Sequence, residues 1–143
     1  MSIRNLFHTI SVLILTLSAT VATTAEPSLK EIMQDLRDNL VEITDGLLVD
    51  DSDRVAQGAT DIAQHAPIAV PQAQRISQEL GPEMAAFKRF DEQVHALSVA
   101  IVAAAIKKDR EVMVVDYQAM VNGCLACHAA FKERVAQALN AAP

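Results

Sequence analysis

Apolar residues recur at steps of three and four over most of the chain, which is the spacing that places them on one face of a helix. Ser28 and Glu31 have the spacing of a capping box, so we expect the first helix to begin at Leu29. Its charged residues fall outside the apolar face, which indicates that the helix packs on a core. This apolar face comprises Leu29, Met33, Leu36, Leu40, Ile43 and Leu47.

A second helix follows a polar interruption at residues 50–52, which supplies its cap. Proline disfavours helix at the residue before it, so this helix must end by Pro67. Residues 66–81 contain two prolines and a glycine, and they are expected to form a connection with one or two helical turns. The inward residues of the second helix are Val55, Ala59 and Ile62.

Pro82 suits the first position of a third helix, and Asp109 suits the cap of a fourth. The apolar face of the third helix comprises Phe87, Phe90, Val94, Leu97, Ile101 and Ala104. That of the fourth comprises Met113, Tyr117, Met120, Cys124, Cys127, Phe131 and Ala138. Short connections favour antiparallel neighbours. The sequence therefore predicts an all-α fold, an antiparallel up-and-down four-helix bundle over residues 26–143.

Residues 1–25 have the pattern of a secretory signal peptide. Arg4 and His8 lie in a short polar stretch, residues 10–22 are apolar, and residues 23–25 offer small side chains for cleavage. The apolar stretch is shorter than a bilayer span, which disfavours a permanent membrane anchor. We therefore expect one exported domain, residues 26–143.

The charge balance is acidic, with 12 Lys and Arg against 18 Asp and Glu. Nucleic-acid binding needs a basic footprint, so this balance disfavours it. An acidic surface keeps a protein soluble and can also steer a basic partner protein toward it.

The run Cys124-Leu125-Ala126-Cys127-His128 has the spacing of covalent c-type haem attachment. On a helix the two thiols project from one side about a turn apart, so each can add to one vinyl group of the same porphyrin. His128 is then placed to become the proximal iron ligand. These are the only two cysteines of the chain, which predicts one covalently bound haem c. Attachment requires reduced thiols outside the cytoplasmic membrane, so the motif and the signal peptide together indicate the periplasm.

Three other roles for the cysteine pair remain open but fit less well. A dithiol redox motif needs a strand before the first cysteine, and no strand pattern precedes Cys124. A structural zinc site needs four ligands, commonly with a second ligand pair. A disulfide between Cys124 and Cys127 would span one helical turn, where its geometry is poor.

The residues from Cys124 to Lys132, with the helical layout, resemble the class II c-type cytochromes, the cytochrome c prime family with its low-spin relatives. These proteins carry the haem motif in the last quarter of an exported four-helix domain, whereas class I cytochromes c carry it near the N-terminus. The family places an aromatic and then a basic residue after the haem histidine, as Phe131 and Lys132 are placed here. The resemblance implies that Phe131 packs on the haem and that Lys132 approaches a haem propionate.

The resemblance also implies that the first helix covers the distal face of the iron, with a methionine in low-spin members and an apolar side chain in five-coordinate members. Met33 is the methionine of that helix. Thioether sulfur is a soft ligand that stabilises ferrous iron and raises the reduction potential. We therefore expect Met33 as the distal ligand opposite His128. The alternative is that Met33 only fills the core.

Other distal residues stay open. Met84 and His65 are expected at the same end of the bundle, although a lone histidine at a helix end is usually solvated. Met120 is expected to pack at the haem edge, and His95 to lie half-exposed beside the apolar face. If Leu29 or Leu36 covers the iron instead, the iron is five-coordinate and open to small gases.

The function expected from these residues is periplasmic electron transfer by a monohaem cytochrome with redox partner proteins, without enzymatic catalysis. No set of residues for hydrolysis, phosphate binding or a protein-only metal centre is evident. The alternative is a five-coordinate haem protein that binds or scavenges nitric oxide or carbon monoxide. Peroxidase-like catalysis would need a distal acid–base group, for which His65 is the one candidate. A homodimer is also open.

Overall fold

A computed structural model of the chain describes residues 26–141. The expected signal peptide, residues 1–25, lies outside the described residues. No strand occurs between residues 26 and 141, which confirms the predicted all-α class. Within this range no helix has the length and apolar character that crossing a membrane requires. The helices are α1 (Leu29–Leu48), α2 (Ser52–Ala63), α3 (Val70–Leu80), the short 3-10 helix η1 (Gly81–Glu83), α4 (Met84–Ile106) and α5 (Arg110–Asn140).

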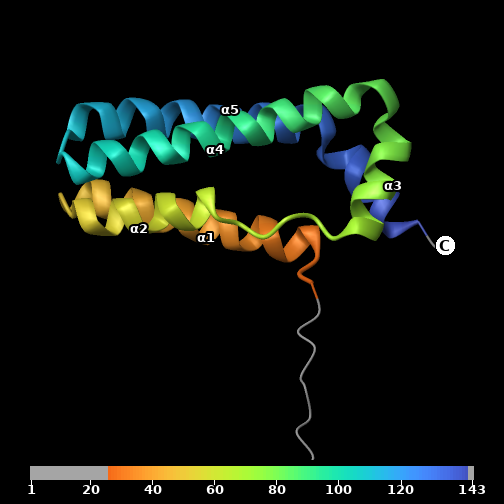
Figure 1. The fold of residues 1–143 in the computed structure, drawn as a ribbon, viewed down its shortest axis with the longest axis horizontal. Helices are drawn as coiled ribbons and strands as arrows, with labels where there is room; N and C mark the ends of the chain where they lie inside the picture. Colours follow the sequence, from red (N-terminus) through yellow and green to blue (C-terminus); the bar gives the residue numbers. More distant parts are fainter. Residues whose placement is uncertain (1–25, 142–143) are drawn as a thin grey trace, which may run out of the picture.

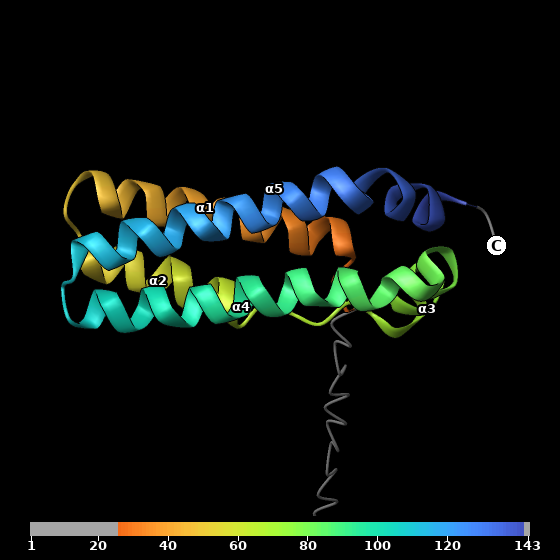
Figure 2. The same cartoon turned by 90° about the horizontal axis from the view of Figure 1, so that it is seen from above.

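Four helices run side by side, and α3 lies across one end of them (Figure 1). α1 and α2 form one layer, and α4 and α5 form the other. Close packing joins α1 to α2, α2 to α4 and α4 to α5. α1 and α5 are not among the closely packed pairs of the described chain, although Figure 2 shows them on the same side of the bundle. We call this the α1–α5 side.

The predicted starts of α1, α2 and α5 are confirmed by their caps, whereas Pro82, expected at the first position of a helix, lies in η1 just before α4. The Ser28 hydroxyl accepts from the Glu31 backbone N–H at 3.3 Å, and the Glu31 carboxylate accepts from the Ser28 N–H at 2.8 Å. The α1–α2 and α4–α5 connections have the same local geometry. In each, a residue with positive φ precedes an aspartate that caps the next helix. These residue pairs are Asp50 and Asp51 in the first connection, and Lys108 and Asp109 in the second.

The predicted connection over residues 66–81 was wrong in one respect, because it contains an 11-residue helix, α3. Pro71 occupies its first turn, where a missing N–H costs no intrahelical hydrogen bond. Ile76 and Leu80 lie one turn apart and are buried in one cluster with Phe131 and Val135 of α5. The packing against α5 is therefore what extends this segment beyond the expected one or two turns.

The core forms two clusters of buried apolar residues, not one. The lower cluster lies toward the α1–α2 and α4–α5 connections, and the upper cluster lies toward α3. Between Ile32 and Ile43, α1 has no buried side chain. The lower cluster comprises Ile43, Leu47, Val55, Ala59, Ile62, Ile101, Ala104, Ala105, Met113 and Met120. The upper cluster comprises Leu29, Ile76, Leu80, Phe131 and Val135.

Gly58 lets α1 and α2 approach closely, so Gly58→Ala is expected to destabilise the fold. A Cβ at this position would lie 2.9 Å from both the Asn39 carbonyl oxygen and Ile43 Cγ1. Such overpacking costs about 1–3 kcal/mol of unfolding free energy, measured by denaturant titration. Gly123→Ala is the control, because its Cβ would come no nearer than 3.7 Å to Val94 Cγ2, and alanine favours helix. Equal stability of the two variants would contradict the close approach.

Candidate functional site

Cys124 and Cys127 lie well inside α5, which is unbroken from Arg110 to Asn140. Both thiols are free and both residues are half-buried. Residues three apart on a helix are neighbours on its surface, so the two sulfurs face the same volume. The prediction that the cysteines lie on the apolar face of the last helix is confirmed.

The environment of the thiols differs from that of a catalytic dithiol. Burial raises the pKa of Cys124. Burial also raises the pKa of Cys127, with smaller contributions from Cys124 and the Asp91 carboxylate. Reactive dithiols have a lowered pKa, commonly at a helix N-terminus, whereas Arg110 at the start of α5 is several turns away. The pair is therefore suited to neutral thiol chemistry and poorly suited to thiol–disulfide exchange.

Cys124 and His128 lie on the side of α5 that faces α1. Tyr117 marks that side, because its hydroxyl oxygen lies 2.6 Å from Thr44 Oγ1 and 3.2 Å from the Leu40 carbonyl oxygen. Seven residues along a helix return to within about 20° of the same direction, and eleven residues complete about three turns. Cys124 and His128 stand seven and eleven residues after Tyr117, so both point toward α1. His128 is exposed there.

Met33 lies on the side of α1 that faces α5, at the level of Cys124. It precedes Leu40 by seven residues, the same step that separates Tyr117 from Cys124. Because α1 and α5 run antiparallel, the two steps of about 10 Å lead to the same level of the bundle. The structure therefore brings Met33 and the cysteine–histidine motif to facing positions on two helices.

The expectation that Met33 is buried was wrong, because its side chain is 39% exposed. Ile32 is buried in its place, at 2% exposure. The sequence pattern identified the correct face of the helix, but α5 does not pack closely against α1 at this level. Met33 consequently lies on the α5 side of α1 without being covered by α5.

These observations fit a planar group held between α1 and α5. The two core clusters are separated at the level of the cysteines, and Cys124 and Cys127 are half-buried at that level. No group of three or more His, Cys, Asp and Glu side chains within residues 26–141 is arranged to hold a metal ion. A porphyrin supplies four of its own ligands to iron, so a haem needs only one or two side chains from the protein. His128 and Met33 are the residues expected for those positions.

The remaining expected neighbours of a haem occupy distinct environments. Phe131 is buried and packs edge-on against Phe87 and Phe90, with ring centroids 5.7 Å and 6.1 Å away. Its place in the core is confirmed, and its contact with haem stays a prediction. Lys132 is exposed. Met84 is half-buried against the upper cluster.

Met120 is fully buried one turn before Cys124, where the Ser98 hydroxyl lies 3.2 Å from its sulfur. This burial among apolar side chains agrees with a packing role below the cysteines. His95 is exposed, as expected, and its Nδ1 lies 3.1 Å from the Ala63 carbonyl oxygen.

His65 was expected to be solvated, but its side chain is only 21% exposed. Its Nε2 lies 3.3 Å from Asp91 Oδ1, and its Nδ1 lies 2.9 Å from the Ala66 carbonyl oxygen. Both partners accept hydrogen bonds, so both contacts are satisfied only when the imidazole carries two protons. These contacts favour the protonated imidazole and engage both ring nitrogens, so His65 is not free to bind iron. Asp91 was missed by sequence reasoning, since only the packing of α2 on α4 brings the pair together.

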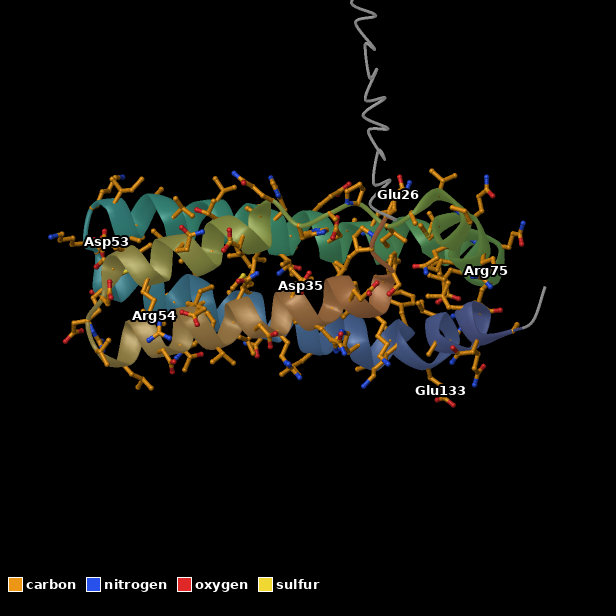
Figure 3. All side chains as sticks on the ribbon, turned by 90° about the horizontal axis from the view of Figure 1, so that it is seen from below. Glu26, Asp35, Asp53, Arg54, Arg75 and Glu133 are labelled. Carbon is orange, nitrogen blue, oxygen red and sulfur yellow. The ribbon has the colours of Figure 1, made fainter. Side chains whose placement is uncertain are left out.

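A groove between α1 and the end of α2 shows which α1 side chains lie on the α2 side of the helix. Its lining includes Ile32, Leu36 and Asp35 of α1, and His65 after α2. Figure 3 shows Asp35 on this side of α1. Ile32 and Leu36 thus turn toward α2, whereas Met33 turns toward α5.

The pair of His65 and Asp91 is expected to stabilise the fold mainly at mildly acid pH. The hydrogen bond to Asp91 raises the pKa of His65 above 6.5, so this contribution is complete below that pH and is lost as the pH rises through the raised pKa. The same bond lowers the pKa of Asp91 below 3.8, so the contribution is also lost as the pH falls through that lowered value. Asp91→Asn should lower the unfolding free energy by less than about 1 kcal/mol at about pH 5.5, and by less still at about pH 8.5.

Asp38→Asn provides the matched control. Asp38 is an exposed carboxylate that pairs with Arg37 at 2.6 Å, and a guanidinium keeps its charge at both pH values. Its loss should therefore have the same small effect at both. Thermal or denaturant unfolding of both variants at the two pH values measures the difference. An Asp91→Asn effect that does not vary with pH would show that His65 does not carry the charge.

Comparison with known proteins adds no assignment to this geometry. No protein-family model, curated protein or solved structure matches the chain. The function of the site therefore rests on the chemistry of Cys124, Cys127, His128 and Met33.

Proposed function

We propose that the chain is an exported, periplasmic monohaem c-type cytochrome that carries electrons between partner proteins. One observation supports this most strongly. Two half-buried free thiols stand one turn apart in an unbroken helix, next to an exposed histidine, and Cys124 and His128 lie on the side of that helix toward Met33 of α1. Cys124 and Cys127 hold the haem, His128 binds the iron on one face and Met33 binds it on the other.

The state of the thiols suits the attachment chemistry. Each thiol adds across a vinyl double bond: a sulfur–carbon bond forms, the S–H bond breaks, and the proton goes to the other vinyl carbon. The addition exchanges no electrons, so it requires reduced cysteines and no oxidant. Burial keeps Cys124 and Cys127 protonated, and their positions on a helical turn oppose a disulfide between them.

A bound haem would supply one-electron chemistry, and the chain would supply ligands carried on helices. His128 sits on α5 and Met33 on α1, so both axial positions belong to helices and not to loops. A thioether opposite an imidazole favours ferrous iron and raises the potential. The excess of acidic over basic residues suits redox partners with a basic docking surface.

A second candidate function follows from the exposure of Met33. If the sulfur leaves the iron, the α1–α5 side offers an open coordination position, and the protein becomes a binder of nitric oxide or carbon monoxide. The 39% exposure of Met33 is the observation that favours this candidate. It ranks second because Met33 has both the level and the direction of a ligand.

Covalent attachment predicts that Cys127→Ala greatly reduces stable holoprotein when the chain is expressed with haem-attachment machinery. The variant cannot form the thioether to Cys127, so the haem between the two core clusters is held by one covalent bond instead of two. Haem staining of denaturing gels measures attachment. Leu125→Ala is the matched control, because Leu125 lies within the motif but is exposed, and its loss should leave staining intact. Acid-extractable haem in the native protein would refute covalent attachment.

Ligation by Met33 predicts a low-spin ferric spectrum with the weak red charge-transfer band of methionine-bound haem. Met33→Ala should remove that band, convert the iron to high spin or water ligation, lower the potential and let ferrous protein bind carbon monoxide. Met84→Ala is the control, since Met84 packs with the upper cluster, and it should leave the spectrum unchanged. A native protein that is already high-spin and binds carbon monoxide readily would favour the gas-binding candidate.

A further inference from the structure

Tyr117 is the only tyrosine of the chain, and it lies between the two helices that carry the proposed iron ligands. Its hydroxyl is 2.6 Å from Thr44 Oγ1, and the Thr44 hydroxyl is 2.8 Å from the Leu40 carbonyl oxygen. The Tyr117 hydroxyl oxygen also lies 3.2 Å from the Leu40 carbonyl oxygen. With one proton on each hydroxyl, two arrangements are consistent: Tyr117 donates to Thr44 and Thr44 to Leu40, or Thr44 donates to Tyr117 and Tyr117 to Leu40. Both protons are used, and the bonds in such a chain strengthen one another. Tyr117 thus ties α5 to the backbone of α1.

This tie has little support from other contacts between α1 and α5. Within residues 26–141, the α5 side chains that hydrogen-bond to α1 or its following turn are Tyr117 and Arg110. Arg110 stands at the far end of the bundle and bonds to Asp50 and the Leu47 carbonyl from an exposed position. Tyr117 is half-buried and two turns from Cys124, so its hydrogen bonds are the α1–α5 hydrogen bonds nearest the proposed haem.

The position of Met33 depends on this contact because Met33 is 39% exposed and belongs to neither core cluster. Between Ile32 and Ile43, α1 has no buried side chain that would fix its distance from α5. Met33 is two helical turns from Leu40, and a helix is stiff over that length. A displacement of α1 at Leu40 is therefore transmitted along the helix toward Met33, as far as the anchor at Leu29 and Ile32. Ligand geometry must hold to about 0.5 Å, so even a small displacement matters.

We propose that Tyr117 is a positioning residue: its bond to Thr44 and the Leu40 carbonyl fixes the spacing of α1 and α5 and thereby holds Met33 on the iron. This inference rests on the proposed function, since it concerns the sixth ligand of the same haem. Tyr117 touches neither the haem nor its ligands in this role. It acts through α1.

The test compares the binding of imidazole to ferric holoprotein. Imidazole must displace Met33 to bind the iron, so its apparent affinity measures how firmly the sulfur is held. Tyr117→Phe keeps the ring and removes the hydroxyl. The affinity for imidazole should rise about two- to tenfold, the range that corresponds to one net hydrogen bond. Covalent haem, measured by gel staining, should stay at the native level.

Three further variants distinguish positioning of Met33 from a general loosening of α1 and α5. Thr44→Val removes the other hydroxyl at nearly constant shape and should raise imidazole affinity by a similar factor. The double variant should then show little additional effect, as expected for two residues in one hydrogen-bonded chain. Arg110→Gln removes the other α1–α5 contact, far from the haem, and should leave imidazole affinity unchanged. This pattern supports the positioning role.

Native imidazole affinity in both Tyr117→Phe and Thr44→Val would overturn the proposal, and so would an equal rise in Arg110→Gln. These results would leave the proposed function intact, because native protein would still bind haem and ligate Met33. A native protein without covalent haem would instead refute the proposed function and the inference together. If Met33→Ala leaves the spectrum unchanged, the inference fails while covalent attachment stands.

Discussion

The arrangement depends on how α2 is bonded to its neighbours, because α2 joins α1 to the rest of the bundle. Gly58 brings the two helices close together, and Arg54 bridges from α2 to Glu42 and Asp45 of α1 at 2.6 Å and 2.9 Å. Figure 3 shows Arg54 over this pair of helices. α2 also packs against α4. It therefore fixes the lower half of α1 relative to α4, and through α4 relative to α5.

α2 has only 12 residues, whereas α1 has 20 and α5 has 31, so this support ends partway along α1. The other end of α1 is held separately. The Leu29 N–H donates to Gln72 Oε1 of α3 at 2.8 Å, and the Leu29 side chain joins the upper cluster. α1 is thus fixed at both ends and spans residues 33–42 without a buried side chain. The cysteines of α5 lie opposite this span of exposed and partly buried residues.

The helices, their starts and the cysteine–histidine motif could be predicted from the sequence because each depends on local signals. A capping box, an aspartate cap and a three-residue cysteine spacing all act within one or two turns. α3 was underestimated, because the burial of Ile76 and Leu80 depends on the distant C-terminal part of α5. His65 was misjudged for the same reason: its partner Asp91 lies on another helix. Periodicity states which residues share a face, but it does not state which neighbour covers that face.

Met33 illustrates this limit and also how the structure resolves it. The apolar face of α1 offered several residues for the distal side of the iron, and periodicity alone could not choose among them. In the structure Leu29 is committed to the upper cluster, and Leu36 turns toward the groove beside α2.

At the next turn, the carbonyl of Leu40 is already used by Thr44 and Tyr117. Met33 is the residue that remains at the level of the cysteines with its side chain directed at α5. Its exposure, which contradicts the expected burial, follows from a span of α1 whose side chains are at most partly buried and against which α5 does not pack closely. A side chain in that position is available to a group held between the helices. Of the α1 residues that could serve there, it is the one whose atom can bind iron.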